Sequence, residues 1–297
     1  MTKSPIYLVH LAADEPRARR IANLLGDSFD PLDAAVAAFA GAGGRWQVDA
    51  YFRSRPDLAA LRALVAAASD DATAQKLTLE RLADRDWVLH SLTGLKPVEA
   101  GRFVVHGAHD RDAVRNRIGI EIEAAQAFGT GHHGTTRGCL VALDAVIRRR
   151  RPRHILDLGT GSGVLAIAAA LALRSPVLAT DIDLVSSRIA RRNAQLNRAG
   201  AWVTALQARG LNARTVVERA PYDLVLANIL LSPLLRLVAP VARTLMPGAH
   251  VILSGLLPTQ ANAVVAACRS QGLALERRIL LDGWVTLLLS AASRYRR

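Results

Sequence analysis

The sequence has few of the residues that build disulfides, metal centres or membrane spans. Its 297 residues include two cysteines, Cys139 and Cys268, which are too few for a disulfide framework or a four-ligand zinc site. The longest uninterrupted apolar run, residues 164–173, is far shorter than the ~20 residues that a membrane-spanning helix needs. Acidic residues and a proline interrupt residues 1–17, so no secretory signal is visible there. These absences favour a soluble, cytoplasmic protein with no membrane partner.

Lysine is also scarce, although the chain is strongly basic. Lysine and arginine total 38 against 25 aspartates and glutamates, which gives a net charge of +13, and only Lys3, Lys76 and Lys96 are lysines. Such a charge attracts polyanions or assemblies rich in them. A general preference for arginine over lysine accounts for the same composition, and the sequence leaves both explanations open.

The order of the elements predicts two domains of different architecture. Residues 1–83 have a β-α-β-β-α pattern that suggests a small α+β domain of the ferredoxin-like kind. Residues 84–112 lose periodicity around several glycines and a proline, and we interpret them as a linker with one strand at 102–105. Residues 113–297 alternate strands with helices, which predicts an α/β domain with a parallel sheet and a closing antiparallel hairpin.

The strongest local signal is the glycine-rich run DLGTGSG at 157–163, where an apolar strand turns into a helix. Glycines at such a turn let the backbone approach a ligand closely. A dinucleotide fingerprint would need its third glycine at position 164, which is Val164. The run, with Gly159 and Gly161 at its centre, instead resembles the first motif of the class I methyltransferases that use S-adenosylmethionine.

Acidic residues follow the next predicted strand. Asp181 stands at the end of that strand, about 20 residues after the glycines, where a carboxylate can accept both ribose hydroxyls of an adenosine. Asp183 is a rival, but its place at the start of the next helix favours a role as N-cap. Helix capping by both residues is the alternative to a ribose site.

Asn228 ends the fourth predicted strand of the sheet, so it should share an edge with Gly159 and Asp181. An asparagine carbonyl there can accept the N–H bonds of an amine and aim its lone pair at a methyl carbon, which makes Asn228 the candidate catalytic residue. Many amino-methyltransferases continue this motif with two prolines and an aromatic residue. Here residues 229–231 are Ile-Leu-Leu, which argues against the usual adenine, cytosine and glutamine methyltransferases.

A glycine- and threonine-rich stretch narrows the function further. The run AFGTGHHGTT at 127–136 resembles the signature of the PrmA family, whose members methylate the eleventh protein of the large ribosomal subunit. Residues 157–169, 227–240 and 253–260 resemble the same family. The resemblance implies a seven-stranded, Rossmann-like catalytic domain, a substrate-recognition domain at the N-terminus and S-adenosylmethionine as cofactor. The cofactor contacts that we expect are Thr136, Gly159, Gly161, Asp181 and Asn228.

The resemblance also implies the substrate and the partners. We expect methylation of lysine ε-amines and of the N-terminal α-amine of that ribosomal protein by a monomer, with ribosome contact as a further candidate and no specific DNA. Acidic residues of the first domain, among them Asp14, Asp30, Asp33 and Asp49, are then expected where it meets a basic substrate. Adjacent histidines such as His132 and His133 cannot easily point at one ion, so no metal is expected.

Two other functions stay open at this point. One keeps the chemistry and changes the substrate to the lysines of an electron-transfer flavoprotein subunit. The other is a non-catalytic, adenosine-binding module that attaches to ribosomes. Asn228 and Thr136 favour an enzyme, since a module that only binds has no need of an amide that orients an amine.

Overall fold

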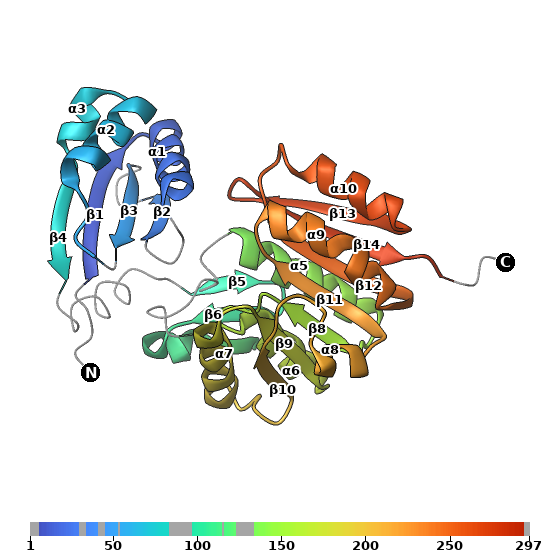
Figure 1. Cartoon of the computed structure of the whole chain (residues 1–297). Coiled ribbons are helices and arrows are strands. Elements are labelled where there is room, and N and C mark those ends of the chain that lie inside the picture. The colour runs from blue at the N-terminus through green and yellow to red at the C-terminus, as the bar shows by residue number, and fades with distance from the viewer. Residues whose placement is uncertain are drawn as a thin grey trace. The chain divides into compact units, whose positions relative to one another are not determined.

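The chain forms two compact units, Met1–Thr93 and Gly94–Arg297, in the computed structural model (Figure 1). The structure describes residues 6–29, 34–40, 45–52, 54–82, 97–114, 116–122 and 134–293. In these ranges no helix is both long and apolar enough to cross a bilayer. Each unit has its own sheet and its own hydrophobic core.

The first unit is an antiparallel sheet with helices packed on one face. Its elements are β1 (Ile6–Ala13), α1 (Glu15–Ser28), β2 (Ala34–Ala40), β3 (Trp46–Phe52), α2 (Leu58–Ala68), α3 (Asp71–Gln75) and β4 (Thr78–Leu82). The strand order is β2-β3-β1-β4, so the pattern is β-α-β-β-α-β, which is ferredoxin-like as predicted. Alternate strand residues such as Val9 and Val48 form the core with Ile21 of α1 and Leu61 of α2.

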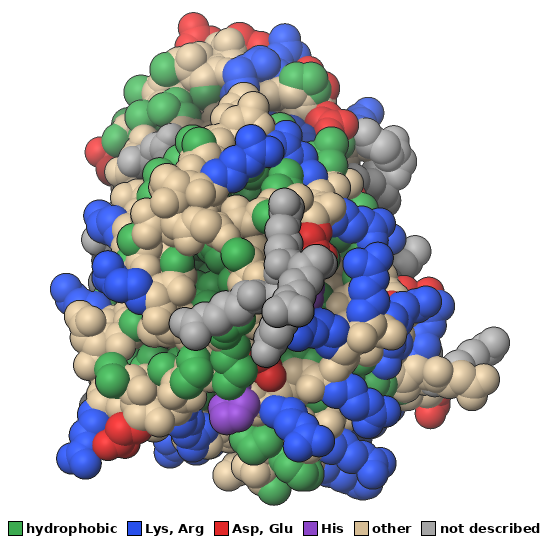
Figure 2. Space-filling model, turned by 90° about the vertical axis from the view of Figure 1, so that its right-hand side faces the viewer, with side chains coloured by type: hydrophobic (Ala, Val, Ile, Leu, Met, Phe, Trp, Pro, Cys, Tyr) green, Lys and Arg blue, Asp and Glu red, His purple; other side chains and the backbone are tan. Residues whose placement is uncertain are grey.

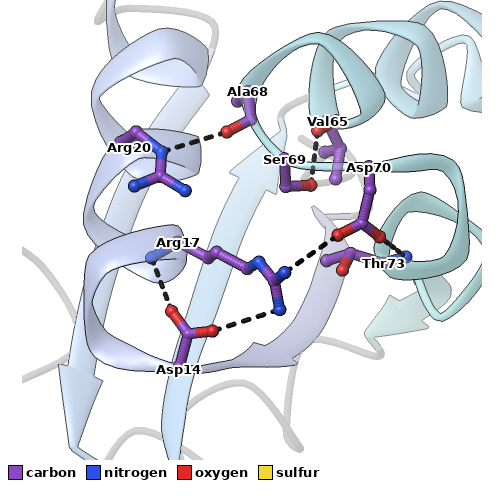
Figure 3. A network of polar contacts seen from close by, with 8 residues as sticks. All are labelled: Asp14, Arg17, Arg20, Val65, Ala68, Ser69, Asp70 and Thr73. Carbon is purple, nitrogen blue, oxygen red and sulfur yellow. Dashed lines mark hydrogen bonds and ion pairs between the residues drawn. The ribbon is translucent and has the colours of Figure 1, made fainter.

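A polar network joins α1 to the turn between α2 and α3 (Figure 3). The Asp14 carboxylate caps α1 by accepting from the backbone N–H of Arg17 at 2.9 Å. The Arg17 guanidinium lies between Asp14, at 3.2 Å, and Asp70, at 3.3 Å. Arg20 donates to the carbonyl of Ala68 at 3.2 Å. These contacts hold the two helical segments side by side over the sheet.

The second unit is built on a seven-stranded sheet that matches the predicted Rossmann-like architecture. Its strand order is β10-β9-β8-β11-β12-β14-β13, and β14 runs antiparallel to both of its neighbours. The elements are β8 (Ile155–Leu158), α6 (Val164–Leu173), β9 (Val177–Asp181), α7 (Leu184–Leu196), β10 (Val203–Gln207), α8 (Arg214–Glu218), β11 (Tyr222–Asn228), α9 (Leu231–Arg243), β12 (Leu245–Leu256), α10 (Ala261–Ser270), β13 (Leu273–Leu281) and β14 (Trp284–Ala291).

Two hydrophobic cores cover the two faces of this sheet. One core lies against α5 (Gly134–Arg149), α6 and α7, and the other against α8, α9 and α10. The central strands are apolar throughout because they are buried on both faces, which is typical of parallel sheets. The predicted closing hairpin is present as β13 and β14.

A small three-stranded sheet precedes α5. It contains β5 (Val98–Ala100), β6 (Phe103–His106) and β7 (Ile118–Glu121), with a short 3₁₀ segment, Ala108–Val114, between β6 and β7. Arg102, between β5 and β6, donates to the Asp144 carboxylate on α5, and Arg148 contacts the same carboxylate at 2.9 Å. Part of the predicted linker, residues 97–112, therefore lies in the second unit. The predicted boundaries at 83 and 112 stay predictions.

Candidate active site

Three predicted site residues lie at one edge of the large sheet. Strands β9, β8 and β11 are parallel neighbours, with Leu158 level with Thr180 on one side and with Ala227 on the other. The next residue of each strand or turn is Gly159, Asp181 or Asn228. Because ligands of open α/β sheets bind beyond the carboxyl ends of the strands, this edge is the candidate active site.

The glycine turn after β8 needs a residue without a side chain at Gly159. This residue has φ +67°, a conformation that side chains disfavour. A Cβ built on Gly159 would also lie closer than 3.0 Å to Cγ2 of Ile229, the residue after β11. The turn is fixed to the neighbouring strand, because Thr160 N–H donates to the carbonyl of Thr180 at 2.9 Å. The turn therefore has a fixed backbone shape that requires glycine at this position.

A buried carboxylate forms hydrogen bonds with the same turn and with the start of α6. Asp157, at the end of β8, is 1% exposed and accepts hydrogen bonds from Thr160 Oγ1 at 2.6 Å and Ala166 N–H at 3.2 Å. Burial raises the pKa of Asp157 to about 7, and the two hydrogen bonds counteract only part of that rise. Asp157 thus gives the site a titrating group near neutral pH.

We expect this carboxyl group to make the unfolding free energy depend on pH. The folded pKa lies above the unfolded value, so the folded state binds more protons between about pH 4 and pH 7, and the contribution of Asp157 to stability falls as pH rises through that range. The full loss is on the order of 4 kcal/mol above the folded pKa. Asp157→Asn keeps an acceptor for Thr160 and removes the titration.

Denaturant unfolding of wild type and Asp157→Asn from pH 4.5 to pH 8.5 checks this expectation. The difference between the two free energies of unfolding should move in favour of the variant as pH rises. Two curves that stay parallel over this range would show that Asp157 does not titrate there.

The two acidic residues at and just after the end of β9, Asp181 and Asp183, have different structural roles. Asp183 caps α7, because its carboxylate accepts from Val185 N–H at 3.0 Å and Ser186 N–H at 2.9 Å, and the predicted N-cap is confirmed. Asp181 accepts from Gly161 N–H at 2.9 Å and from Asp183 N–H at 3.0 Å, so it joins the glycine turn to the start of α7. Each oxygen of this half-buried carboxylate keeps further acceptor capacity toward the edge.

The structure brings Asn228 together with the start of α5. Its Nδ2 atom lies 3.4 Å from Thr135 Oγ1 and 3.5 Å from Thr136 Oγ1. Both threonine side chains are buried, whereas Asn228 is half-buried. With Nδ2 held by the two hydroxyls, Oδ1 remains as an acceptor. Thr135 was not singled out from the sequence, although the paired threonines of the 127–136 motif contained the signal.

Ile229 is a second residue that the sequence did not single out. Its side chain packs over Gly159, and its backbone faces Gly255 in β12, where a Cβ would collide with the Ile229 carbonyl. Its N–H donates to the carbonyl of Ser254 at 3.2 Å. Ile229 therefore holds the ends of three neighbouring strands in a fixed arrangement.

Part of the predicted site lies outside the described residues. This applies to residues 127–133 of the glycine- and threonine-rich stretch, including His132 and His133. Among the residues that the structure does describe, no three His, Cys, Asp or Glu side chains group together in a way that could hold a metal ion.

Comparison with known proteins identifies relatives over almost the whole chain. The family model described as ribosomal protein L11 methyltransferase (PrmA) matches residues 33–292. A ribosomal protein L11 methyltransferase of Rhodopseudomonas palustris is 56% identical over 93% of this chain and 94% of its own length. One from Bradyrhizobium diazoefficiens is 52% identical over 97% of this chain and 99% of its own.

A solved structure agrees with these relatives. The crystal structure of ribosomal protein L11 methylase from Lactobacillus delbrueckii subsp. bulgaricus is 25% identical, with a TM-score of 0.58, and the match covers 67% of this chain and all of that one. The resemblance inferred from the motifs is confirmed, and the chain belongs to the ribosomal protein L11 methyltransferase (PrmA) family.

Proposed function

We propose that this chain transfers methyl groups from S-adenosylmethionine to amines of ribosomal protein L11. The observation that carries the proposal is the placement of Asn228, whose Nδ2 atom is held by Thr135 and Thr136 at the edge that also bears Gly159 and Asp181. The names of the relatives supply the substrate. They give no support to a flavoprotein substrate or to a non-catalytic module.

The residues at this edge suit S-adenosylmethionine. Asp181 offers carboxylate oxygens to ribose hydroxyls, and Gly159 and Gly161 present a glycine backbone with positive φ beside it. We assign Thr136 and Asn228 to the end of the cofactor that carries the methyl group. When bound, the cofactor supplies a methyl carbon attached to a sulfonium, which an amine can attack.

The chain's own contribution is to aim a neutral amine. Lysine has an ordinary pKa near ~10.4, so partial desolvation at the site is needed to favour the form with a free lone pair. Asn228 Oδ1 accepts an N–H of that amine and fixes the direction of the lone pair. In the transfer, the amine nitrogen would bond to the methyl carbon as the carbon–sulfur bond breaks, its electron pair would stay on sulfur in the departing thioether, and solvent would take the amine proton. Positioning of this kind supplies much of the rate.

We assign substrate recognition to the first unit, but not through all the acids predicted for it. Asp14 caps α1 and pairs with Arg17. Asp49 is 9% exposed, and its carboxylate lies 2.5 Å from His10 Nδ1. Both carboxylates therefore have partners within the unit, so they do not support the predicted acidic recognition surface. Asp30 and Asp33 lie outside the described residues.

Methylation of purified, unmodified ribosomal protein L11 tests the proposal. With labelled S-adenosylmethionine we expect label on that protein, and mass spectrometry should place it on lysine ε-amines and the N-terminal α-amine. An electron-transfer flavoprotein subunit assayed in parallel is the control for the alternative substrate. Label on that subunit alone would refute the proposed substrate, and label on neither would refute the enzyme.

The remaining expectations follow from this substrate. We place the reaction in the cytoplasm, because the proposed substrate is a ribosomal protein. The monomeric state and ribosome contact stay predictions, and size-exclusion chromatography of the purified chain checks the first of them.

A further inference from the structure

Exposed arginines gather at the edge of the large sheet opposite the candidate active site. Because its parallel strands start at a common edge, the segments that enter them lie together there. Each of these segments carries exposed arginine: Arg149, Arg151 and Arg153 before β8, Arg174 before β9, Arg198 before β10, Arg219 before β11, Arg243 before β12 and Arg269 before β13.

The segment before β8, residues 149–153, is held in place, and we call it the basic ledge. The Asp223 carboxylate of β11 accepts from Arg153 N–H at 2.8 Å and His154 N–H at 2.9 Å. The Asp223 N–H donates to the carbonyl of His154 at 2.9 Å. The Arg150 guanidinium donates to the carbonyl of Gly248, and Pro152 is buried. The ledge is therefore a built surface whose charges project from a fixed backbone.

The acidic residues near this edge already have partners. Asp144 pairs with Arg148, Glu218 pairs with Arg214, and Glu276 lies 3.4 Å from His250 Nε2. In contrast, Arg149, Arg151 and Arg153 form no ion pair with any residue that the structure describes. Figure 2 faces the side on which β14 ends, and on that face Lys and Arg side chains predominate over Asp and Glu.

An aromatic side chain lies at the same edge. Trp202 is 37% exposed, and its carbonyl accepts from Val177 N–H at 2.8 Å, which places it at the start of β9 and β10 near Arg174 and Arg198. An exposed aromatic among positive charges is the arrangement that binds unpaired bases by stacking while cations contact phosphates. Arginine suits phosphate especially, because its planar guanidinium can donate two parallel hydrogen bonds to it.

We propose that this edge, with the basic ledge at its centre, binds the phosphate backbone of RNA. A general preference for arginine accounts for exposed arginines elsewhere, but at this edge every segment that enters the sheet carries one, and the nearby acidic residues already have partners. RNA is favoured over an acidic membrane because exposed Trp202 offers a flat face on which an unpaired base can stack, beside arginines that can contact phosphate. RNA bound there leaves the candidate active site at the opposite edge open. The proposal goes beyond the methyl transfer and does not depend on it.

Two matched triple variants test the proposal by fluorescence anisotropy with a 20-nucleotide hairpin RNA at several KCl concentrations. The ledge variant is Arg149→Ser, Arg151→Ser and Arg153→Ser. The control variant is Arg55→Ser, Arg236→Ser and Arg277→Ser, which removes the same charge from exposed positions elsewhere. Near 0.15 M salt we expect the ledge variant to bind at least about tenfold more weakly, with a salt slope smaller by roughly 0.9 for each phosphate that is no longer neutralised. The control should stay within about twofold.

Several outcomes would overturn the proposal. Equal loss of RNA affinity in both triple variants would mean that only the net charge of the protein matters. An absence of salt-dependent RNA binding by the wild type would refute the proposed RNA surface. Binding to phosphatidylserine vesicles without binding to RNA would assign the edge to a membrane. A second variant, Arg174→Ser with Arg198→Ser, removes positive charge from two other segments of the same edge. It should also weaken RNA binding, and it provides the test if the ledge variant proves unstable.

A methylation assay distinguishes failure of the RNA-binding proposal from failure of the proposed function. The ledge variant should methylate free ribosomal protein L11 at the wild-type rate, because its changes lie at the opposite edge from Asn228. Loss of RNA binding with methylation retained supports the RNA surface alone. A wild type that binds RNA but methylates nothing would refute the proposed function and leave the RNA surface standing.

Discussion

Replacing Asn228 with alanine is expected to lower the rate of methyl transfer to ribosomal protein L11 by at least about 100-fold. Asn228 Oδ1 is the acceptor left free at the site once Nδ2 is held by Thr135 and Thr136. Without this acceptor an amine can still enter, but its lone pair is no longer aimed at the methyl carbon. Steady-state kcat with both substrates saturating measures the loss.

Binding of S-adenosylmethionine separates this effect from loss of the cofactor. By calorimetry, Asp181→Ala should weaken cofactor binding, because its carboxylate is the assigned ribose acceptor, whereas Asn228→Ala should act mainly on kcat. Thr136→Val removes a hydroxyl that holds Nδ2 and leaves the amide in place, so we expect a smaller loss of kcat than with Asn228→Ala. An Asn228→Ala variant that keeps more than a tenth of the wild-type rate would contradict the proposed role.

The elements that could be predicted from the sequence are those whose pattern is long enough to be read locally. Alternating β and α units indicated the large sheet and its final hairpin, and β1, α1, β2, β3 and α2 indicated the ferredoxin-like unit. The missed helices and strands are short: α3, β4 and α8 have five residues each, β7 has four and β5 has three. Segments of that length form because of tertiary contacts, as when Arg102 beside β5 reaches Asp144 on α5.

The same distinction applies to the candidate site. Gly159, Asp181 and Asn228 could be placed because a glycine turn and the ends of parallel strands follow a topological rule. The contact of Thr135 with Asn228 joins residues 93 positions apart, and no local pattern encodes it. Asp49 shows the converse: the basic substrate implied by the resemblance suggested a recognition role for it, whereas the fold buries it beside His10.

Replacing Gly159 with alanine is expected to damage both stability and cofactor binding. Its φ of +67° costs an alanine about 1–2 kcal/mol, and the collision of the new Cβ with Ile229 Cγ2 adds about 1–3 kcal/mol. We therefore expect the free energy of unfolding to fall by roughly 2–5 kcal/mol. Any shift of the turn that relieves the collision moves the backbone away from the assigned cofactor position, so affinity for S-adenosylmethionine should fall too.

A matched glycine variant and a double-mutant cycle separate the backbone strain of Gly159→Ala from its collision with Ile229. Gly248 has φ +72°, but a Cβ there would meet only the Arg150 guanidinium, at 3.6 Å, so Gly248→Ala carries the backbone strain without the collision. Ile229→Ala removes Cγ2 and should recover the collision part of the Gly159→Ala loss, which appears in the cycle as a coupling free energy of at least about 1 kcal/mol. If Gly159→Ala costs no more than Gly248→Ala and shows no coupling to Ile229, then the packing of Ile229 over the glycine turn does not determine its shape.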